Sequence, residues 1–364
     1  MALQVAVWGT GNVGRPAIRA VLAHQDLELS DVIVANPDKI GKDAGELVGI
    51  NPVGLAATDD WQAVLNRRPD AVIYAANADT RPEEAQAELL ACLNAGRNVI
   101  ATGFYSFLHP GSTAEEVLAP VRTACREGGG SLFVSGIDPG WAMDMLPVVV
   151  SGTVANISEI RSREIFNYAL YDAPHVVREV IGFGESMEQL PLMLHDFAIE
   201  MVWGPMLRLV GESLGQPVVR IDSVVERRPL EQDIDVPGMG LFRKGGQGAF
   251  RFEVRGYTEG SDSPLYVLEH VTRIDDACAP DWPYPPNAGG CHQVIISGDP
   301  TMTVSVHGHD HHEAGAAAGG NASAAAYVVN AIPAVCAAAP GIVTLLDLPP
   351  IRGNRQLAAQ GRFK

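Results

Sequence analysis

Positive charge is scarce in this chain of 364 residues. It holds 26 Lys and Arg against 43 Asp and Glu, a formal net charge of −17. Such a surface repels the phosphates of nucleic acids and of anionic membranes. Charged residues make up only 19% of the chain and hydrophobic residues 47%. Because disordered chains show the opposite balance, we expect a folded protein that binds neither nucleic acid nor membrane.

Cysteine is also rare. The five cysteines lie far apart and include no C-x-x-C pair, which favours a reducing compartment over a disulfide framework. No apolar run approaches the ~20 residues that span a bilayer, and no basic segment followed by an apolar one begins the chain. We therefore expect a cytoplasmic protein.

At roughly 150 residues per domain, the length suits two domains. The first 145 residues alternate short apolar strands with helical segments, the pattern of a Rossmann-type, doubly wound parallel α/β sheet. The expected strands are residues 3–8, 31–35, 71–75, 98–101 and 131–135. The expected helices are residues 16–23, 61–67, 82–95 and 114–127.

Long alternating segments follow from about residue 151, and they predict a mostly antiparallel sheet in an α+β domain over residues 146–313. These segments are residues 157–168, 217–227, 249–258, 265–274, 293–297 and 301–307. A helix over 187–214, interrupted near Gly204 and Pro205, would cover one face of the sheet. Within the last part, 314–364, we expect a helix over 322–339 with Asn321 as its cap and a kink at Pro333.

A glycine-rich motif follows the first strand and opens a helix, the context of a dinucleotide fingerprint. Gly9 permits the tight turn, Gly11 lets the backbone approach a pyrophosphate, and Gly14 lets helix and strand pack closely. A glycine-rich turn in any α/β domain is the alternative. The expected cofactor-binding residues are Gly9, Thr10, Gly11, Asn12, Val13, Asn36, Lys39, Ala76, Asn77, Thr102 and Gly103.

The end of the second strand should hold the adenosine ribose. Enzymes that prefer NAD place an acidic residue there, whose charge repels the 2′-phosphate of NADP. This chain has neutral Asn36, with Lys39 and Lys42 nearby, which favours NADP. NAD stays possible if Asp38 takes the ribose and the lysines are solvated.

Four stretches resemble a known family: V-A-V-W-G-T-G-N-V-G (5–14), N-P-D-K-I-G-K-D-A-G-E (36–46), G-I-D-P-G-W (136–141) and V-N-A-I-P (329–333). They are similar to the dihydrodipicolinate reductase-like family, in its group of NAD(P)-dependent amine dehydrogenases and 2,4-diaminopentanoate dehydrogenase. The resemblance implies an oxidoreductase that moves hydride to or from the C=N or C=O carbon of a small apolar amine, imine or ketone. It also implies a homodimer, a substrate domain that contributes to dimerisation, and a C-terminal helix that returns to the nucleotide domain.

The resemblance does not extend to the acid/base residue. In the amine dehydrogenases a Glu serves this role in the loop after the strand leading to the nicotinamide, but the matching stretch F-Y-S-F-L-H-P (104–110) has no carboxylate. Tyr105 and His109 are therefore the expected catalytic residues, because a phenol can protonate a carbonyl oxygen and a histidine titrates near pH 6.5. Alternatively, Phe104, Tyr105 and Phe107 form only an apolar wall. A carbonyl reductase without amine activity and a non-catalytic dinucleotide sensor both stay open.

Four aromatic side chains are the expected substrate-binding residues: Phe104, Tyr105, Trp141 and Tyr168. Trp141 lies in a turn after the last strand of the first domain, where substrates bind in such folds. Asp138 and Asp144 in the same turn could orient a substrate or cap the next helix. Tyr168 ends a strand, where it could line a cleft or pack within the sheet.

A histidine-rich stretch, H-G-H-D-H-H-E (307–313), is conspicuous. Imidazoles and carboxylates are ordinary ligands of zinc and nickel. The spacing matches no finger or H-E-x-x-H pattern, and an Ala-Gly run follows. We expect a surface loop with no functional metal.

Overall fold

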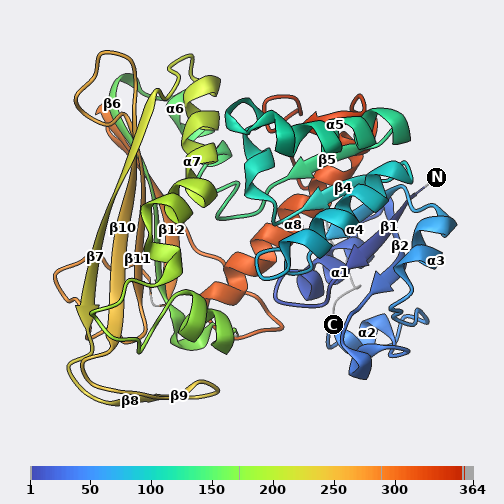
Figure 1. The fold of residues 1–364 in the computed structure, drawn as a ribbon, viewed down its shortest axis with the longest axis horizontal. Coiled ribbons are helices and arrows are strands. Elements are labelled where there is room, and N and C mark those ends of the chain that lie inside the picture. Colours follow the sequence, from blue (N-terminus) through green and yellow to red (C-terminus); the bar gives the residue numbers. More distant parts are fainter. Residues whose placement is uncertain (1, 172, 288, 355, 357–364) are drawn as a thin grey trace. The chain divides into compact units, whose positions relative to one another are not determined.

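The computed structural model describes residues 2–354, apart from residues 172 and 288, together with residue 356. The chain divides into two compact units, each with its own sheet (Figure 1). The first comprises the described residues up to Ile137 and from Asn321 onward, and the second is Asp138–Gly320. These divisions were expected after residues 145 and 313. No helix of the described residues is long and apolar enough to cross a membrane.

The first unit holds a six-stranded parallel sheet in the order β14-β5-β4-β3-β1-β2. Its strands are β1 (Leu3–Trp8), β2 (Leu27–Ile33), β3 (Ala71–Tyr74), β4 (Asn98–Ala101), β5 (Ser131–Val134) and β14 (Gly341–Val343). The Rossmann-type prediction is confirmed. The second strand was expected at 31–35 but begins at Leu27, which pairs with Leu3 on β1. β14 was not expected, because a three-residue strand is defined by its pairing with β5.

Helices cover this sheet: α1 (Gly14–Ala23), α2 (Ala44–Leu47), α3 (Trp61–Arg67), α4 (Pro82–Asn94), α5 (Glu115–Gly128) and α8 (Ala316–Ala337). α8 packs its apolar residues Val328 and Ile332 into the same core as Val5 and Val7 of β1. The prediction that Asn321 caps α8 was wrong, since the alanine-rich segment already starts the helix at Ala316. Pro333 lies inside the helix.

The second unit holds a six-stranded mixed sheet in the order β13-β12-β6-β11-β10-β7, with a small β8-β9 sheet beside it. The strands are β6 (Ala155–Asn167), β7 (Arg220–Pro229), β8 (Ile234–Val236), β9 (Gly240–Phe242), β10 (Gln247–Tyr257), β11 (Tyr266–Arg273), β12 (Gly290–Asp299) and β13 (Met302–Val306). The mostly antiparallel prediction is confirmed. The β6–β11 pair is parallel, which alternation along the sequence does not reveal.

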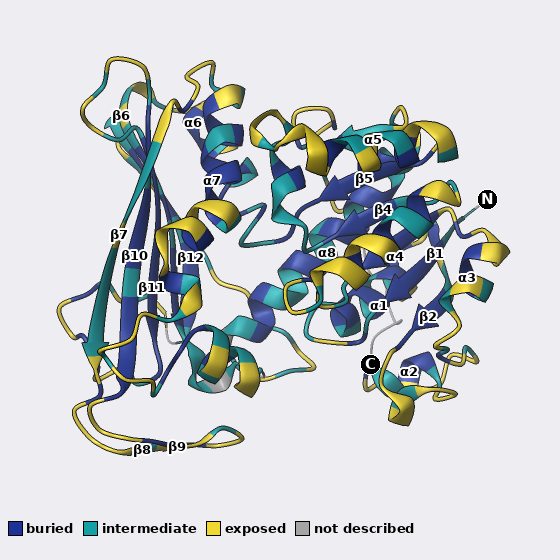
Figure 2. Ribbon diagram, viewed as in Figure 1, coloured by how far each residue is buried: buried dark blue, intermediate teal, exposed yellow. Residues whose placement is uncertain are grey.

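Two helices, α6 (Met145–Ser151) and α7 (Asp196–Ser213), lie on one face of this second sheet (Figure 1). The prediction of one helix over 187–214 was wrong in its first part, where a short 3-10 turn (Leu192–Leu194) follows Pro191. The predicted interruption was also wrong, because α7 continues through Gly204 and Pro205. The inner strands of the sheet are largely buried (Figure 2).

Candidate functional site

The glycine loop after β1 has the geometry of a phosphate cradle. Gly9 has φ +107°, and a Cβ there would lie 2.7 Å from the Ala75 carbonyl oxygen. A Cβ on Gly14 would lie 2.0 Å from the carbonyl oxygen of Gly9, whereas one on Gly11 would meet nothing within 4 Å. The outer two glycines are thus required by packing. Gly11 faces open space, which fits the close approach of a cofactor phosphate.

Positive charge gathers beside this loop. The Lys39 ammonium donates hydrogen bonds to Thr10, to the carbonyl oxygen at 3.1 Å and to Oγ1 at 3.0 Å. Partial burial and the nearby charges of Arg15 and Lys42 lower the pKa of Lys39. An anion bound here would relieve the repulsion among these cations. Asn36 caps its own turn, because its Oδ1 accepts from the backbone N–H of Asp38 at 2.9 Å.

The other predicted cofactor residues follow the carboxyl ends of neighbouring strands. Ala76 and Asn77 follow β3, and Thr102 and Gly103 follow β4. Because β3 and β4 are adjacent and parallel, their ends meet at one edge, where ligands bind in such sheets. The Asn77 Oδ1 accepts from two backbone N–H groups of its own turn and shapes that loop.

A carboxylate from the loop after β3 lies next to the aromatic loop after β4. Phe104 adopts φ +63° and its ring centroid lies 5.4 Å from that of Tyr74. The Tyr105 hydroxyl donates to Oδ2 of Asp79, in the loop after β3, at 3.2 Å. His109 Nδ1 lies 2.9 Å from Ser112 Oγ, within its own turn. The carboxylate missing from 104–110 is therefore present beside Tyr105 in space.

A second polar site lies in the second unit, and sequence reasoning missed most of it. We call it the acid–histidine cluster, made of Asp138, Glu164, His270 and His292. Glu164 on β6 pairs in register with His270 on β11 and with His292 on β12. Adjacent strands therefore place the three side chains side by side on one face. All four side chains are 10% exposed or less.

Ion-pair contacts link the acid–histidine cluster. His270 Nε2 lies 2.9 Å from Asp138 Oδ2, although the angles do not make a well-directed hydrogen bond, and His270 Nδ1 lies 3.5 Å from Glu164 Oε1. His292 Nε2 lies 3.3 Å from Glu164 Oε2. Trp203 of α7 donates from Nε1 to Asp138 Oδ1 at 2.9 Å. Tyr168 donates from its hydroxyl to Glu164 Oε1 at 3.1 Å.

Burial and charge oppose each other in this cluster. Burial alone would raise the pKa of Asp138, but the charge of His270 outweighs it and the pKa is lowered. Burial alone would lower the pKa of His270, but the charges of Asp138 and Glu164 raise it. The two shifts favour an Asp138 carboxylate paired with a His270 imidazolium. Burial, with a smaller contribution from the charge of Asp138, raises the pKa of Asp144 to about 7.

The remaining predicted residues fall into two groups. Trp141 and Tyr168 are half-buried in the second unit. Of the residues predicted from the sequence, Asp138 belongs to the acid–histidine cluster and Tyr168 contacts it. Asp144 caps α6 by accepting from the Met145 N–H. A histidine at an inward position of a largely apolar strand, as His270 on β11 and His292 on β12, is the sequence signal that could have pointed to the cluster.

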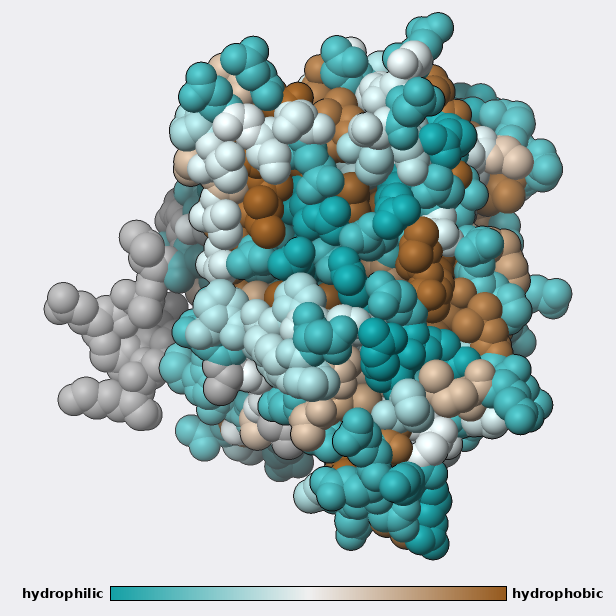
Figure 3. Space-filling model, turned by 90° about the vertical axis from the view of Figure 1, so that its left-hand side faces the viewer, coloured by the Kyte–Doolittle hydropathy of each residue, from teal (hydrophilic) through white to brown (hydrophobic). Residues whose placement is uncertain are grey.

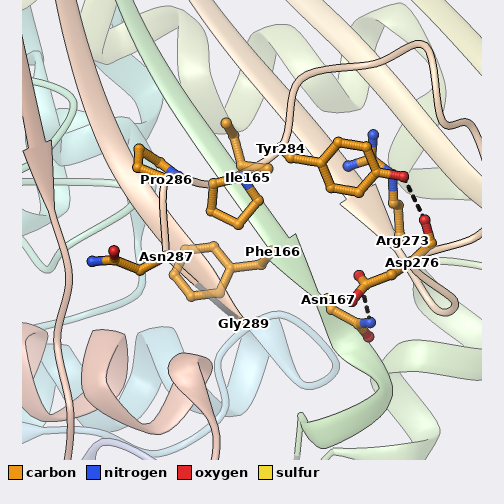
Figure 4. Close-up of a pocket in the computed structure, with 10 residues that line it drawn as sticks. Ile165, Phe166, Asn167, Arg273, Asp276, Tyr284, Pro286, Asn287 and Gly289 are labelled. Carbon is orange, nitrogen blue, oxygen red and sulfur yellow. Dashed lines mark hydrogen bonds between the residues drawn. The ribbon is translucent and has the colours of Figure 1, made fainter.

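Two other features carry no chemistry that we assign. A cavity of about 170 Å³ opens at the end of β6 (Figure 4), but the guanidinium of Arg273 beside it is used by the carbonyl oxygens of Cys278, Ala279, Trp282 and Pro283. Residues 307–313 form a loop between β13 and α8. Asp138, Glu164 and His292 offer ligand atoms within 4.8 Å of one another. Asp138 already forms an ion pair with His270 at 2.9 Å, so we assign no metal.

Comparisons with known proteins agree with this geometry. Residues 3–109 match the family model "Dihydrodipicolinate reductase, N-terminus", and residues 141–360 match "2,4-diaminopentanoate dehydrogenase C-terminal domain". An amine dehydrogenase of Streptomyces virginiae is 46% identical over 95% of this chain and 96% of its own. The 2,4-diaminopentanoate dehydrogenase of Acetoanaerobium sticklandii is 22% identical over 95% and 93%. The solved structure of an amine dehydrogenase from Mycobacterium smegmatis shares the fold, with a TM-score of 0.76 at 22% identity over 98% and 99% of the chains.

The parallel sheet and its glycine loop define an NAD(P)-dependent oxidoreductase. Within that class, the chain belongs to the dihydrodipicolinate reductase-like family, in the group of the amine dehydrogenases and 2,4-diaminopentanoate dehydrogenase.

Proposed function

We propose that this enzyme interconverts a small, largely apolar amine and the corresponding carbonyl compound with NADP as the hydride carrier. The amine dehydrogenase that is 46% identical over nearly the whole chain carries this proposal. It favours a CH–NH2 oxidoreductase over a carbonyl reductase and over a non-catalytic dinucleotide sensor. When bound, the nicotinamide supplies or accepts the hydride. The glycine loop, with Gly11 facing open space, would hold the phosphates of the cofactor.

NADP is favoured over NAD by the charges around the glycine loop. Lys39 contacts Thr10, and Arg15 and Lys42 lie near enough to lower its pKa. The position after the second strand carries neutral Asn36. A 2′-phosphate would therefore meet cations and no opposing carboxylate from that residue.

We propose that Tyr105 and His109 are the acid/base residues next to the nicotinamide. The Tyr105 phenol donates a hydrogen bond to the Asp79 carboxylate at 3.2 Å. It can therefore return a proton to the substrate without staying ionised itself. Phe104, Trp141 and Tyr168 would supply apolar contacts to the substrate. His109, turned toward Ser112, is the weaker of the two candidates.

The decisive assay follows NADPH oxidation with a cyclic ketone, with and without ammonia. We expect oxidation to depend on ammonia, because an imine has to form before hydride is taken up. Tyr105→Phe should lower turnover about a hundredfold if it exchanges the proton, while Tyr284→Phe, at the cavity of Figure 4, serves as the matched control. Ammonia-independent oxidation would identify a carbonyl reductase, and tight NADPH binding without turnover a sensor.

We further propose a homodimer formed through the open face of the second sheet. The described residues place no helix on this face, which Figure 3 shows as hydrophilic side chains interspersed with hydrophobic ones. Its central Glu269 is fully buried by Arg161, Arg163 and Arg251. A surface that mixes both signs of charge can pair with a second copy of itself across a two-fold axis.

Val224 tests this dimer, since it is 40% exposed and lies opposite Glu253 on the open face. We expect sedimentation equilibrium to give twice the mass of the chain, and Val224→Glu to weaken the dimer at least tenfold by burying a charge, about 1.4 kcal/mol or more. Val219→Glu, outside β7 and 60% exposed, is the control. A monomeric wild type would refute the dimer. We also place the enzyme in the cytoplasm, where its five free thiols stay reduced.

A further inference from the structure

We infer that the acid–histidine cluster exchanges a proton with the substrate nitrogen through the hydroxyl of Tyr168, with Glu164 as the proton acceptor behind it. The inference rests on the proposed amine chemistry. It assigns to the second unit a proton path distinct from the Tyr105–Asp79 pair of the first unit.

Contacts within the second unit trace this path. Tyr168 is half-buried, whereas the side chains of the cluster are 10% exposed or less. Its hydroxyl reaches Glu164 Oε1 at 3.1 Å. The ring is held against those of Tyr171 and Phe183, with centroids 5.1 and 6.4 Å away. Tyr168 is thus the more exposed end of this chain of contacts.

The charges of the cluster favour a cation beside Tyr168. Asp138 and His270 form one ion pair, oriented by the Trp203 N–H. Glu164 then carries a second negative charge, which His270 Nδ1 approaches only to 3.5 Å. His292 Nε2 faces the other Glu164 oxygen. Burial raises the pKa of Asp144 near Asp138, and Glu269 near His270 is paired with three arginines, so neither adds a full negative charge. A buried carboxylate without a full counter-charge is costly, so an ammonium group near Tyr168 stabilises it.

The proton moves without creating net charge in the buried region. An N–H bond of the substrate ammonium breaks as an O–H bond forms at Tyr168. The original hydroxyl proton of Tyr168 passes to Glu164 Oε1 at the same time. A neutral amine and a neutral glutamic acid result, and the amine now has the lone pair that hydride loss requires. Burial and the charge of Glu164 hold the pKa of Tyr168 well above its ordinary value, so the hydroxyl passes the proton on and does not store it.

Difference infrared spectroscopy on the full-length protein tests the transfer directly. The probe is tert-butylamine, which has no hydrogen on its amine carbon and cannot be oxidised. Binding should produce the C=O band of a protonated carboxylic acid in the wild type, and Glu164→Gln and Tyr168→Phe should abolish it. Glu159→Gln, on the opposite face of β6, and Tyr284→Phe are matched controls that should keep it. A band that persists in Glu164→Gln, or no band in the wild type, would overturn the inference.

The pH dependence of amine oxidation supplies the second readout. Because Glu164 has to be ionised to accept the proton, kcat/KM of the wild type should fall as the pH drops. Both variants should be at least tenfold slower at neutral pH and should lose this acid limb. Wild-type profiles in both would refute the path while leaving amine oxidation intact, whereas a wild type inactive on every amine would refute the proposed function. Tyr168→Phe keeps the ring packing, so it decides the matter if Glu164→Gln does not fold.

Discussion

Lys39→Glu is expected to reverse the cofactor preference. The substitution removes a charged hydrogen-bond donor beside Thr10 and puts a carboxylate where the 2′-phosphate of NADP would bind. Losing the attraction and adding repulsion should cost about 4 kcal/mol, roughly a thousandfold in the ratio of kcat/KM values for NADPH and NADH. Steady-state kinetics with both cofactors measures that ratio.

Lys244→Glu is the control for this charge reversal, because Lys244 belongs to the second unit and the glycine loop to the first. It should leave the ratio unchanged. A wild type that prefers NADH strongly, or a Lys39→Glu variant with the wild-type ratio, would contradict the assignment of NADP and leave Asp38 as the ribose-binding residue.

Gly11→Val should weaken cofactor binding, whereas Gly14→Val should destabilise the fold. A Cβ at residue 11 would meet no protein atom within 4 Å, so the Gly11→Val variant should fold with a wild-type melting temperature. It would occupy the space of the cofactor phosphates and should raise the Kd for NADPH roughly a thousandfold, about 4 kcal/mol. A Cβ at residue 14 would clash with the Gly9 carbonyl group at 2.0 Å, so that variant should lose stability itself.

Thermal unfolding with and without NADPH separates the two outcomes. Gly11→Val should lose the stabilisation that cofactor gives the wild type, because a ligand raises the melting temperature only when it binds. If Gly11→Val binds NADPH like the wild type, the phosphates do not lie against this loop.

Local patterns predicted much of the first unit. The strands 3–8 and 98–101 and the helix 61–67 have the expected bounds. Each has a signal within its own residues, such as an apolar run or the Asp60 side chain that caps the helix. β14 and the start of β2 escaped prediction because the partner strand defines them.

The acid/base candidates also divide into what local sequence predicts and what only folding brings together. From the sequence, the stretch 104–110 lacks a carboxylate, and that observation holds. Folding brings Asp79 to Tyr105 from the end of a neighbouring strand. It also brings Glu164, His270 and His292 together from three strands. No spacing rule within one segment could join residues whose proximity depends on strand order and register.

The scarcity of cations and the position of the glycines were readable from the sequence by itself, because charge balance and turn geometry are properties of single segments. They predicted a protein that does not bind nucleic acid, and they indicated the Rossmann-type unit and its dinucleotide site. Tertiary structure alone decided where Lys39 meets Thr10 and which buried carboxylates face a histidine. These contacts depend on side chains from distant segments, and only the packed sheets bring such segments within hydrogen-bond distance.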